Sequence, residues 1–324
     1  MKIIKVIVFI IIISPFIWGQ EIDESLADKI TSIGEDLLEG YTQPFTTAFG
    51  TAVATGLFHS AYSHDVLGFD LGVRVMYIHI PSDAKYFQGN ALLCSLAAGE
   101  LVCDSIELDS VSTIFGPDVD TDVSTGNAVG VPPYIPGGFD LDGVPFFMPQ
   151  LNIGLLFGSE IAIRYLPPIT FKESKLSFLG IGFKQEITKL PGLKQVPMPF
   201  AIAIGAAYQT FNVKDAEGEE ILKSKTWCVQ IIASKRLAVF EPFVAAGLEG
   251  TNIDFHYDFE YELPSPIDGQ TVSFTRPVDV TLSSQTNYRA VAGFTLRMGF
   301  FYIHYDFNMS RYKTHNAIVG LTFR

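Results

Sequence analysis

The stretch FYIHYDFNM at residues 301–309 decides the fold. Its odd-numbered positions are aromatic or aliphatic, and the positions between them carry polar groups: Tyr302, His304, Asp306 and Asn308. Successive side chains of a β-strand leave opposite faces, so a period of two predicts a strand with one apolar and one polar face. Such a strand suits lipid on one side and a polar lumen on the other.

The same alternation recurs along most of the chain. Eleven segments carry it: residues 45–58, 66–80, 146–157, 159–170, 175–188, 199–211, 221–236, 238–263, 272–298, 300–311 and 315–324. A sheet in lipid has to close on itself, because each unpaired backbone amide there costs several kcal/mol. Single-chain bacterial barrels have even strand numbers, so we predict an all-β fold, a closed antiparallel transmembrane β-barrel of about 12 strands, within a range of 10–14.

The N-terminus indicates export. Residues 1–19 begin with Lys2 and Lys5, continue in an unbroken apolar run from Val6 to Ile13, and end in a plausible cleavage region. These are the parts of a secretory signal peptide. We therefore expect export by the Sec pathway and residence in the outer membrane of a Gram-negative cell.

Residues 20–40 are expected to form an amphipathic helix. Ile22, Leu26, Ile30, Ile33 and Leu37 recur at helical spacing, and Gly40 is a suitable stop. Two placements remain open. The helix packs in the periplasm beneath the barrel, or it enters the lumen as a plug.

The barrel itself is expected to occupy residues 41–324. Alternation of short turns with long connections places residues 81–145 outside the cell as one large loop. Residues 250–285 read as a protruding hairpin, since about 9–11 tilted residues suffice to span lipid and this segment is far longer. The alternation in 238–263 shifts by one near Gly250, which predicts a β-bulge.

Charge and cysteine content exclude some classes of protein. The chain has 22 basic and 35 acidic residues, a balance that disfavours nucleic-acid binding, which needs basic surface. Cys94 and Cys103 lie nine apart in the large loop and could pair in an oxidising compartment. Cys228 lies in a predicted strand, where we expect a small buried side chain.

Ten ionisable residues fall on the faces opposite the lipid-facing residues. They are the candidate lumen-lining residues Asp70, Arg74, Glu160, Arg164, Lys184, Glu186, Arg289, Arg297, His304 and Asp306. One interpretation is that they pair across strands and fill a small barrel. The other is that they line a polar path for a solute. The small residues on the same faces, such as Gly180 and Ala203, leave room for the second.

Sites of metal binding or catalysis are weakly indicated. The ladder Asp254, His256, Asp258 and Glu260 shares one strand face and could offer oxygens to a divalent cation, although a solvated face explains it equally. His59, Ser60, His64 and Asp65 resemble hydrolase residue types but lack a supporting spacing. We expect no enzyme activity and no cofactor.

The end of the chain resembles known outer-membrane barrels. Its last strand, Ala317 to Phe323, ends in a penultimate aromatic residue, similar to the signal read by the barrel-assembly machinery. The layout of residues 41–324, with the stretches GLFHSA at 56–61 and RYLP at 164–167, resembles an uncharacterised family of predicted outer-membrane proteins. An N-terminal segment before a barrel is also distantly similar to fatty-acid transporters with an N-terminal hatch.

Two classes of function follow from these features. The first is a channel or transporter for small molecules, hydrophobic ones included. The alternative is a closed structural or surface-interaction barrel without transport, and an outer-membrane hydrolase is a third class. The expected partners are outer-membrane lipid, the barrel-assembly machinery through the C-terminal strand and, for a transporter, a small solute.

Overall fold

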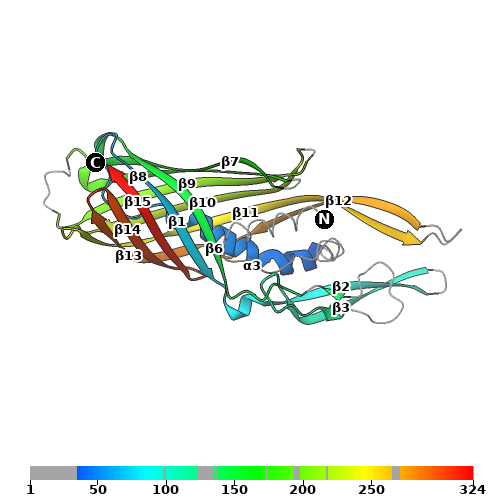
Figure 1. Ribbon diagram of the computed structural model, residues 1–324. Helices are drawn as coiled ribbons and strands as arrows, with labels where there is room; N and C mark the ends of the chain where they lie inside the picture. Colours follow the sequence, from blue (N-terminus) through cyan, green and yellow to red (C-terminus); the bar gives the residue numbers. More distant parts are fainter. Residues whose placement is uncertain are drawn as a thin grey trace.

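The computed structural model describes residues 35–97, 100–122, 134–135, 137–171, 174–192, 198–216, 218–264 and 271–323. Ten antiparallel strands close into a barrel (Figure 1): β1 (Phe69–His79), β6 (Gly143–Gly154), β7 (Ser159–Phe171), β8 (Ser174–Glu186), β9 (Ala201–Lys214), β10 (Glu220–Ser234), β11 (Phe240–Pro264), β13 (Tyr288–Met298), β14 (Phe301–Met309) and β15 (Thr314–Phe323). Pairing of β1 with β15 and of β10 with β11 completes the ring. The predicted closed barrel is confirmed, at the lower end of the expected strand number.

The remaining elements lie beyond one end of the barrel, except for a helix that runs into the barrel and two short turns at the other end (Figure 1). They are the helix α3 (Glu35–Ala54), the strands β2 (Tyr86–Ala97), β3 (Glu100–Ser112), β4 (Thr121–Asp122), β5 (Tyr134–Ile135) and β12 (Thr271–Ser283), and the short 3-10 turns η1 (Ser82–Ala84), η2 (Leu156–Gly158) and η3 (Ile187–Lys189). β12 pairs with β11 from Asn252 onward and so continues the hairpin beyond the barrel. We call the described residues within 80–142 and 252–283 the extension; it lies at the opposite end from the C-terminus (Figure 1). No helix in the described part of the chain has the length and apolarity needed to cross a membrane.

The predicted strand at residues 45–58 is wrong, because these residues belong to α3 and the turn after it. Phe45, Phe49, Val53 and Leu57 recur every four residues, which is the helical period, and all four are buried. The small residues between them imitate the second face of a strand. Of the predicted helix at 20–40, residues 35–40 form the start of α3, and 20–34 lie outside the described residues.

The strand count changes for the same reason. Removing 45–58 leaves ten of the eleven predicted segments. The segment 272–298 divides into β12 and β13, of which β13 alone belongs to the barrel wall. The predicted twelfth strand is therefore absent from the ring.

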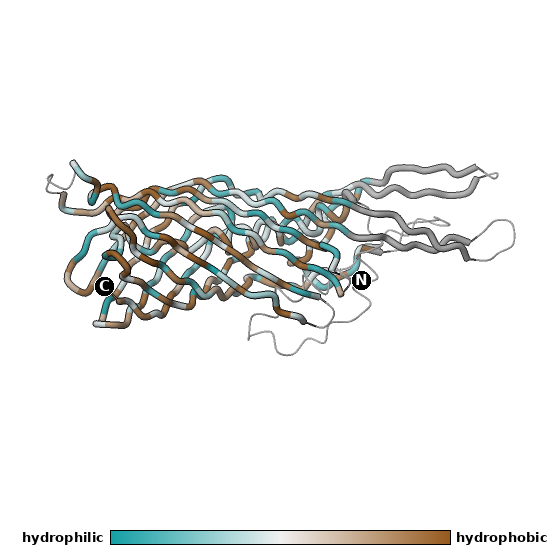
Figure 2. Tube along the Cα trace, turned by 90° about the horizontal axis from the view of Figure 1, so that it is seen from above, coloured by the Kyte–Doolittle hydropathy of each residue, from teal (hydrophilic) through white to brown (hydrophobic). Residues whose placement is uncertain are grey.

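The outer surface of the barrel is apolar and the inner surface is polar within one band. Outward side chains such as Val73, Ile181, Val229 and Ile231 are about half exposed. The charged residues that alternate with such outward residues along the strands point into the barrel. Figure 2 shows the resulting alternation of hydrophobic and hydrophilic residues along the strands. This is the arrangement that lipid contact requires.

The pattern inverts where the strands leave this band. On β11 the buried inward residues change from Glu241 and Glu249 to Ile253 and Phe255. The outward residues change in the opposite sense, from exposed Leu248 to exposed Asn252 and His256. Water then lies outside and an apolar core lies inside, as in a soluble domain.

No β-bulge accompanies this inversion. The pairing of β11 with β10 runs without a register shift from Phe243 through Gly250 to Phe255. The predicted bulge near Gly250 is therefore wrong. The same alternate positions of β11 point inward from Glu241 to Phe255. What changes is the surroundings: lipid outside and a polar lumen inside give way to water outside and an apolar core inside.

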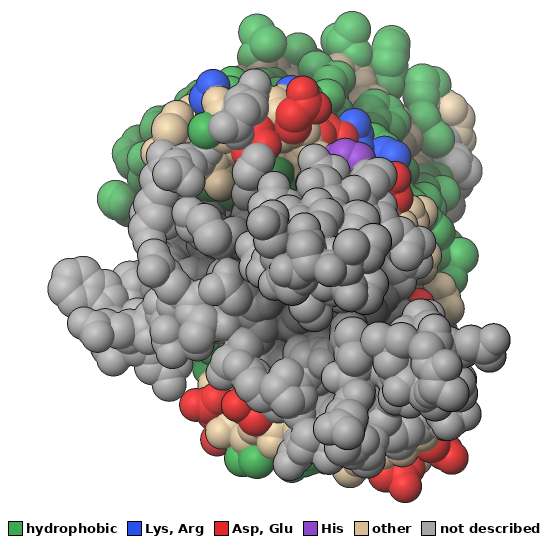
Figure 3. All heavy atoms as spheres, turned by 90° about the vertical axis from the view of Figure 1, so that its right-hand side faces the viewer, with side chains coloured by type: hydrophobic (Ala, Val, Ile, Leu, Met, Phe, Trp, Pro, Cys, Tyr) green, Lys and Arg blue, Asp and Glu red, His purple; other side chains and the backbone are tan. Residues whose placement is uncertain are grey.

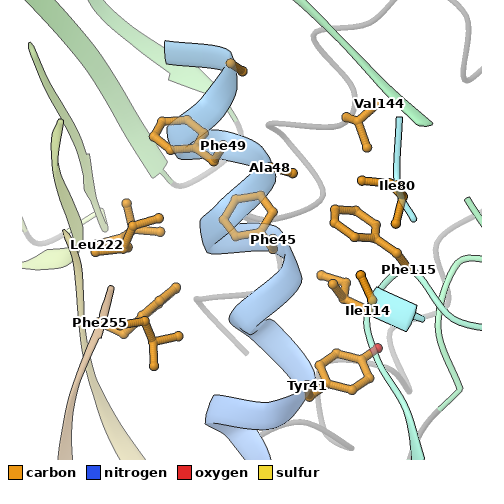
Figure 4. Close-up of a cluster of buried hydrophobic side chains, with 14 of the residues drawn as sticks. Tyr41, Phe45, Ala48, Phe49, Ile80, Ile114, Phe115, Val144, Leu222 and Phe255 are labelled. Atoms are coloured by element: carbon orange, nitrogen blue, oxygen red, sulfur yellow. The ribbon is translucent and has the colours of Figure 1, made fainter. Parts of the chain in front are cut away.

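The apolar core beyond the band forms around α3. Figure 4 shows Tyr41, Phe45 and Phe49 on the helix, with Leu222 and Phe255 on one side and Ile80, Ile114, Phe115 and Val144 on the other. The Tyr41 hydroxyl donates to the Gly137 carbonyl at 3.0 Å, and burial raises the pKa of this hydroxyl above its usual value. The extension and the helix therefore share one core.

A charge inside the apolar band tests the placement of lipid. Val229→Arg on β10 is expected to cost about 2–4 kcal/mol of unfolding free energy, since the guanidinium would enter hydrocarbon. Denaturant titration in phospholipid bilayers measures this loss. Lys225→Arg, one step above the band on the same strand face, is the control and is expected to change little. Equal losses at both positions would contradict the placement.

Candidate functional site

The lumen of the barrel is filled by the chain itself. The α3 helix enters from the extension, ends at Ala54, and residues 55–64 continue along the interior to β1. We call residues 35–64 the plug. From Tyr41 to Ala61 nearly every plug side chain is buried, and Thr51 and Ala61 are fully enclosed.

Two lumen arginines hold the C-terminal end of α3. Arg164 donates to the carbonyl oxygens of Val53 and Thr55, each at 2.7 Å, and Arg289 donates to that of Ala54. The last carbonyls of a helix lack intrahelical partners and form the negative end of its dipole. Two buried guanidinium groups thus satisfy both the hydrogen bonds and the charge of this helix end.

Gly56 turns the chain out of the helix. Its φ of +68° is the left-handed conformation that glycine adopts without strain. A Cβ here would lie 2.8 Å from Nδ2 of Asn316 on β15, so the position also permits close approach to the wall.

Gly56→Ala is expected to cost about 1–2 kcal/mol of unfolding free energy, because a left-handed residue gains a side chain. Chemical denaturation gives the measurement. Gly299→Ala is the matched control, with φ of +65° and open space around the added atom. A loss at Gly56 no larger than that at Gly299 would contradict the close contact with Asn316.

Charged residues bind the part of the plug that follows α3, at residues 60–63. Lys184 donates to the carbonyls of Ser60 and Tyr62, both at 3.1 Å. Glu186 accepts from the amide and the hydroxyl of Ser63 at 2.7 and 2.9 Å. These partners come from one strand, β8, which therefore contacts the plug at three positions, Ser60, Tyr62 and Ser63.

A buried network follows around His64. Oε2 of Glu160 lies 2.8 Å from Nδ1 of His64, and Oε1 lies 2.9 Å from Nζ of Lys184. The other ring nitrogen of His64 lies 3.3 Å from Asp70, which also accepts from Tyr302 at 3.0 Å. The carboxylates are thus compensated by hydrogen bonds and cations, as burial of a charge requires.

Every barrel strand makes a polar contact with the plug. Besides the residues above, these contacts come from Gln150, Gln209, Ser234, Glu241, Thr295, Asn308 and Thr322. The bonds to plug backbone are concentrated in residues 53–64, after the body of α3. The plug is therefore an integral layer of the fold.

The ten candidate lumen-lining residues all lie inside the barrel. Nine are buried, and the Arg297 side chain is 12% exposed and pairs with Glu241 at 3.2 Å. Arg74 and Arg164 both donate to Oε1 of Gln150, and His304 pairs with Asp306 at 2.9 Å. They contact the plug, one another or other polar residues of the wall, such as Gln150 and Glu241.

Sequence reasoning missed several members of the site. Glu241 and Glu249 lie on the polar face of β11, eight residues apart, and that spacing was the available signal. Glu249 pairs with Arg289 at 3.2 Å. The amides Gln150 and Gln209 carry no charge, so nothing in the sequence distinguished them from ordinary strand residues.

Among the residues with described side chains, the acidic ladder on β11 does not form a metal-binding cluster. Asp254 pairs with Lys225 at 3.1 Å, and His256 pairs with Asp279 across the hairpin. The side chains of Asp258 and Glu260 lie outside the description. Among described residues no group of three or more His, Cys, Asp or Glu could hold a metal ion.

The cysteines divide between two environments. Cys228 is free and buried on β10, as predicted. The register of the β2–β3 hairpin places Cys94 directly opposite Cys103, although their side chains lie outside the description.

Solved structures with related folds are distant. The translocator domain of the autotransporter NalP from Neisseria meningitidis is 9% identical, with a TM-score of 0.29 over 85% of this chain and 93% of that one. The beta domain of the Bordetella autotransporter BrkA is 11% identical, with a TM-score of 0.25 over 80% and 99%. Scores this low carry no argument, and the fold rests on the strand pairing.

Sequence comparison is more informative about kinship. No relative was found among curated proteins. The model of a family of unknown function, DUF6588, matches residues 1–323. The chain is therefore a member of the DUF6588 family.

Proposed function

We propose that this protein is an outer-membrane barrel that is closed along its axis and presents its extension at the cell surface for contact with a partner. The plug is the observation that carries the proposal. More than a dozen hydrogen bonds join residues 53–64 to the barrel wall. At a net 0.5–1.5 kcal/mol each, they oppose withdrawal by on the order of 10 kcal/mol.

Passage of a solute along the axis was the leading expectation from the sequence. It would require the plug to leave, which breaks these bonds and removes the carbonyl partners of Arg164, Lys184 and Arg289. Lys184 and Arg289 would keep Glu160 and Glu249, but Arg164 would keep only the neutral amides of Gln150 and Gln209. Uncompensated buried charges are costly. The lumen charges are thus better explained as the lining that holds the plug.

The extension supports a role at the surface. β11 continues from the barrel to Pro264, and the core around α3 gives this region its own packing. Figure 3 looks onto this end and shows acidic side chains at its rim. Outer-membrane residence after Sec export is part of the proposal and rests on the predicted signal peptide and the apolar band.

Planar-bilayer conductance tests closure. The purified protein is expected to give no stable pores. A variant lacking residues 35–64 is the positive control if it still forms a barrel by circular dichroism. Steady, reproducible pores from the unaltered protein would overturn the proposal.

Epitope labelling tests the orientation. An epitope inserted between Pro264 and Thr271 is expected to be labelled on intact cells. An epitope inserted after Gly192, at the opposite end, is expected to require permeabilisation of the outer membrane. The reverse pattern would place the extension in the periplasm and contradict a surface role.

A further inference from the structure

One pair of neighbouring strands in the barrel, β6 and β7, is unpaired over most of its length. Only residues Leu151–Gly154 of β6 pair with β7, opposite Glu160–Ile163, which is four register positions. Every other neighbouring pair keeps at least eight. Above this point the two strands run apart toward the extension (Figure 1), and we call the interval between residues 143–150 and 164–171 the seam.

Prolines stand where hydrogen bonds would close the seam. The Gly154 amide bonds to Gly68, toward β1, so the odd-numbered positions of β6 face β7. The Leu155 amide bonds to the Ser159 carbonyl, so the odd-numbered positions of β7 face β6. Continuing the register predicts three further bonded pairs: Pro149 with Tyr165, Phe147 with Pro167, and Pro145 with Ile169.

Each of these three pairs lacks an amide donor. Proline has no N–H, so it occurs on strand edges and not where a ladder bond is needed. An unpaired amide in hydrocarbon costs several kcal/mol, and the prolines remove three of the six amides that would face the gap. The seam is therefore a tolerated opening in the wall at this level.

The interior behind the seam is correspondingly exposed. Phe146, Met148 and Leu166 pack on the apolar core but are only partly buried. Inward-facing residues behind fully paired strands are enclosed, with Met76 1% and Phe178 3% exposed. Phe146 also contacts Phe49 of the plug, at 6.1 Å between ring centroids. The opening thus reaches the helix core.

We propose that the seam is a lateral binding site for an acyl chain of a surrounding membrane lipid. Its two edges, residues 143–150 and 164–171, carry one charged residue, Arg164, whose buried side chain points into the lumen and bonds to the plug. The β6 edge pairs with β1 opposite Val73 and Tyr77, which belong to the lipid-facing surface, so the opening is continuous with hydrocarbon. A hydrocarbon chain is the occupant that fits an opening in lipid whose one charged side chain is directed into the lumen. This site goes beyond the proposed function and does not require the plug to move.

Quenching by brominated acyl chains tests the site. The variant Phe146→Trp is made with Trp227→Phe, and Trp18 lies in the leader expected to be removed. In vesicles of brominated phosphatidylcholine, the introduced indole is expected to be quenched about as strongly as Trp227 of the unaltered protein, which faces lipid. Phe178→Trp in the same background is the control behind a closed wall, and severalfold weaker quenching is expected. Equal quenching of the two variants overturns the proposal.

Restoring the missing donors provides a second arm. In Pro149→Thr/Pro167→Thr, two of the three pairs regain an amide, and quenching of the Phe146→Trp reporter is expected to fall severalfold. Unchanged quenching contradicts the role of the prolines. Quenching by a free brominated fatty acid but not by the phospholipid contradicts membrane lipid as the occupant. Conductance is measured in parallel on the same variant. A barrel that does not conduct but whose Phe146→Trp reporter is quenched shows that lipid binding at the seam is independent of closure along the axis.

Discussion

Alanine replacement of Arg164 and Arg289 together is expected to turn a silent barrel into a conducting one. The two guanidinium groups donate to the last two carbonyls of α3, those of Val53 and Ala54, and to that of Thr55, and both are almost fully buried. Unsatisfied buried carbonyls cost about 1–3 kcal/mol each, so the plugged state should lose several kcal/mol relative to an opened one. Planar-bilayer recording measures the opening, and denaturant titration measures the loss.

Arg311→Ala is the matched control. Arg311 pairs with Asp83 at the surface and its side chain is 38% exposed, so little change in conductance or stability is expected. If the double variant remains silent while its stability falls, the arginines stabilise the barrel without holding the plug. That result would falsify the assignment of the helix end as the closing element.

Removing Glu160 is expected to give the second large effect. This carboxylate compensates Lys184 and His64 together, and all three are buried. Taking one partner from a buried ion pair costs about 3–5 kcal/mol, because the other charge is left uncompensated. Glu160→Met should therefore lower the unfolding free energy by several kcal/mol in denaturant titration.

The double variant Glu160→Met/Lys184→Met distinguishes pairing from packing. It removes both charges and keeps comparable volume, so it is expected to be more stable than Glu160→Met alone. Additive losses would show that the two side chains act independently. Lys184 would then be held by the Ser60 and Tyr62 carbonyls and not by Glu160.

Most of the wall could be predicted from the sequence. A period of two marks each strand without reference to its neighbours, and residues 301–309 indeed form β14 between β13 and β15. The same period assigned all ten candidate residues to the inside. Glu241 and Glu249 were recognisable by the same rule.

The alternation of apolar and polar residues could not predict the plug. Residues 45–57 satisfy a helical period and imitate a strand period, because small residues fill the intervening positions. Whether such a segment joins the wall or occupies the lumen depends on side chains far away in sequence, Arg164 and Arg289 among them. Sequence separation hides those contacts.

The sequence by itself determined that the chain closes into a barrel with an apolar outside and a polar inside. Local alternation carries that information, since each strand reports its own two faces. The tertiary structure alone decided what the polar inside does. Closure of the ring brings His304, Asp306 and Asn308 of the opening stretch against the plug and its neighbours, with Asn308 bonded to Thr55 at 2.7 Å. The bond between Asn308 and Thr55 joins residues 253 positions apart, and only the folded chain makes them neighbours.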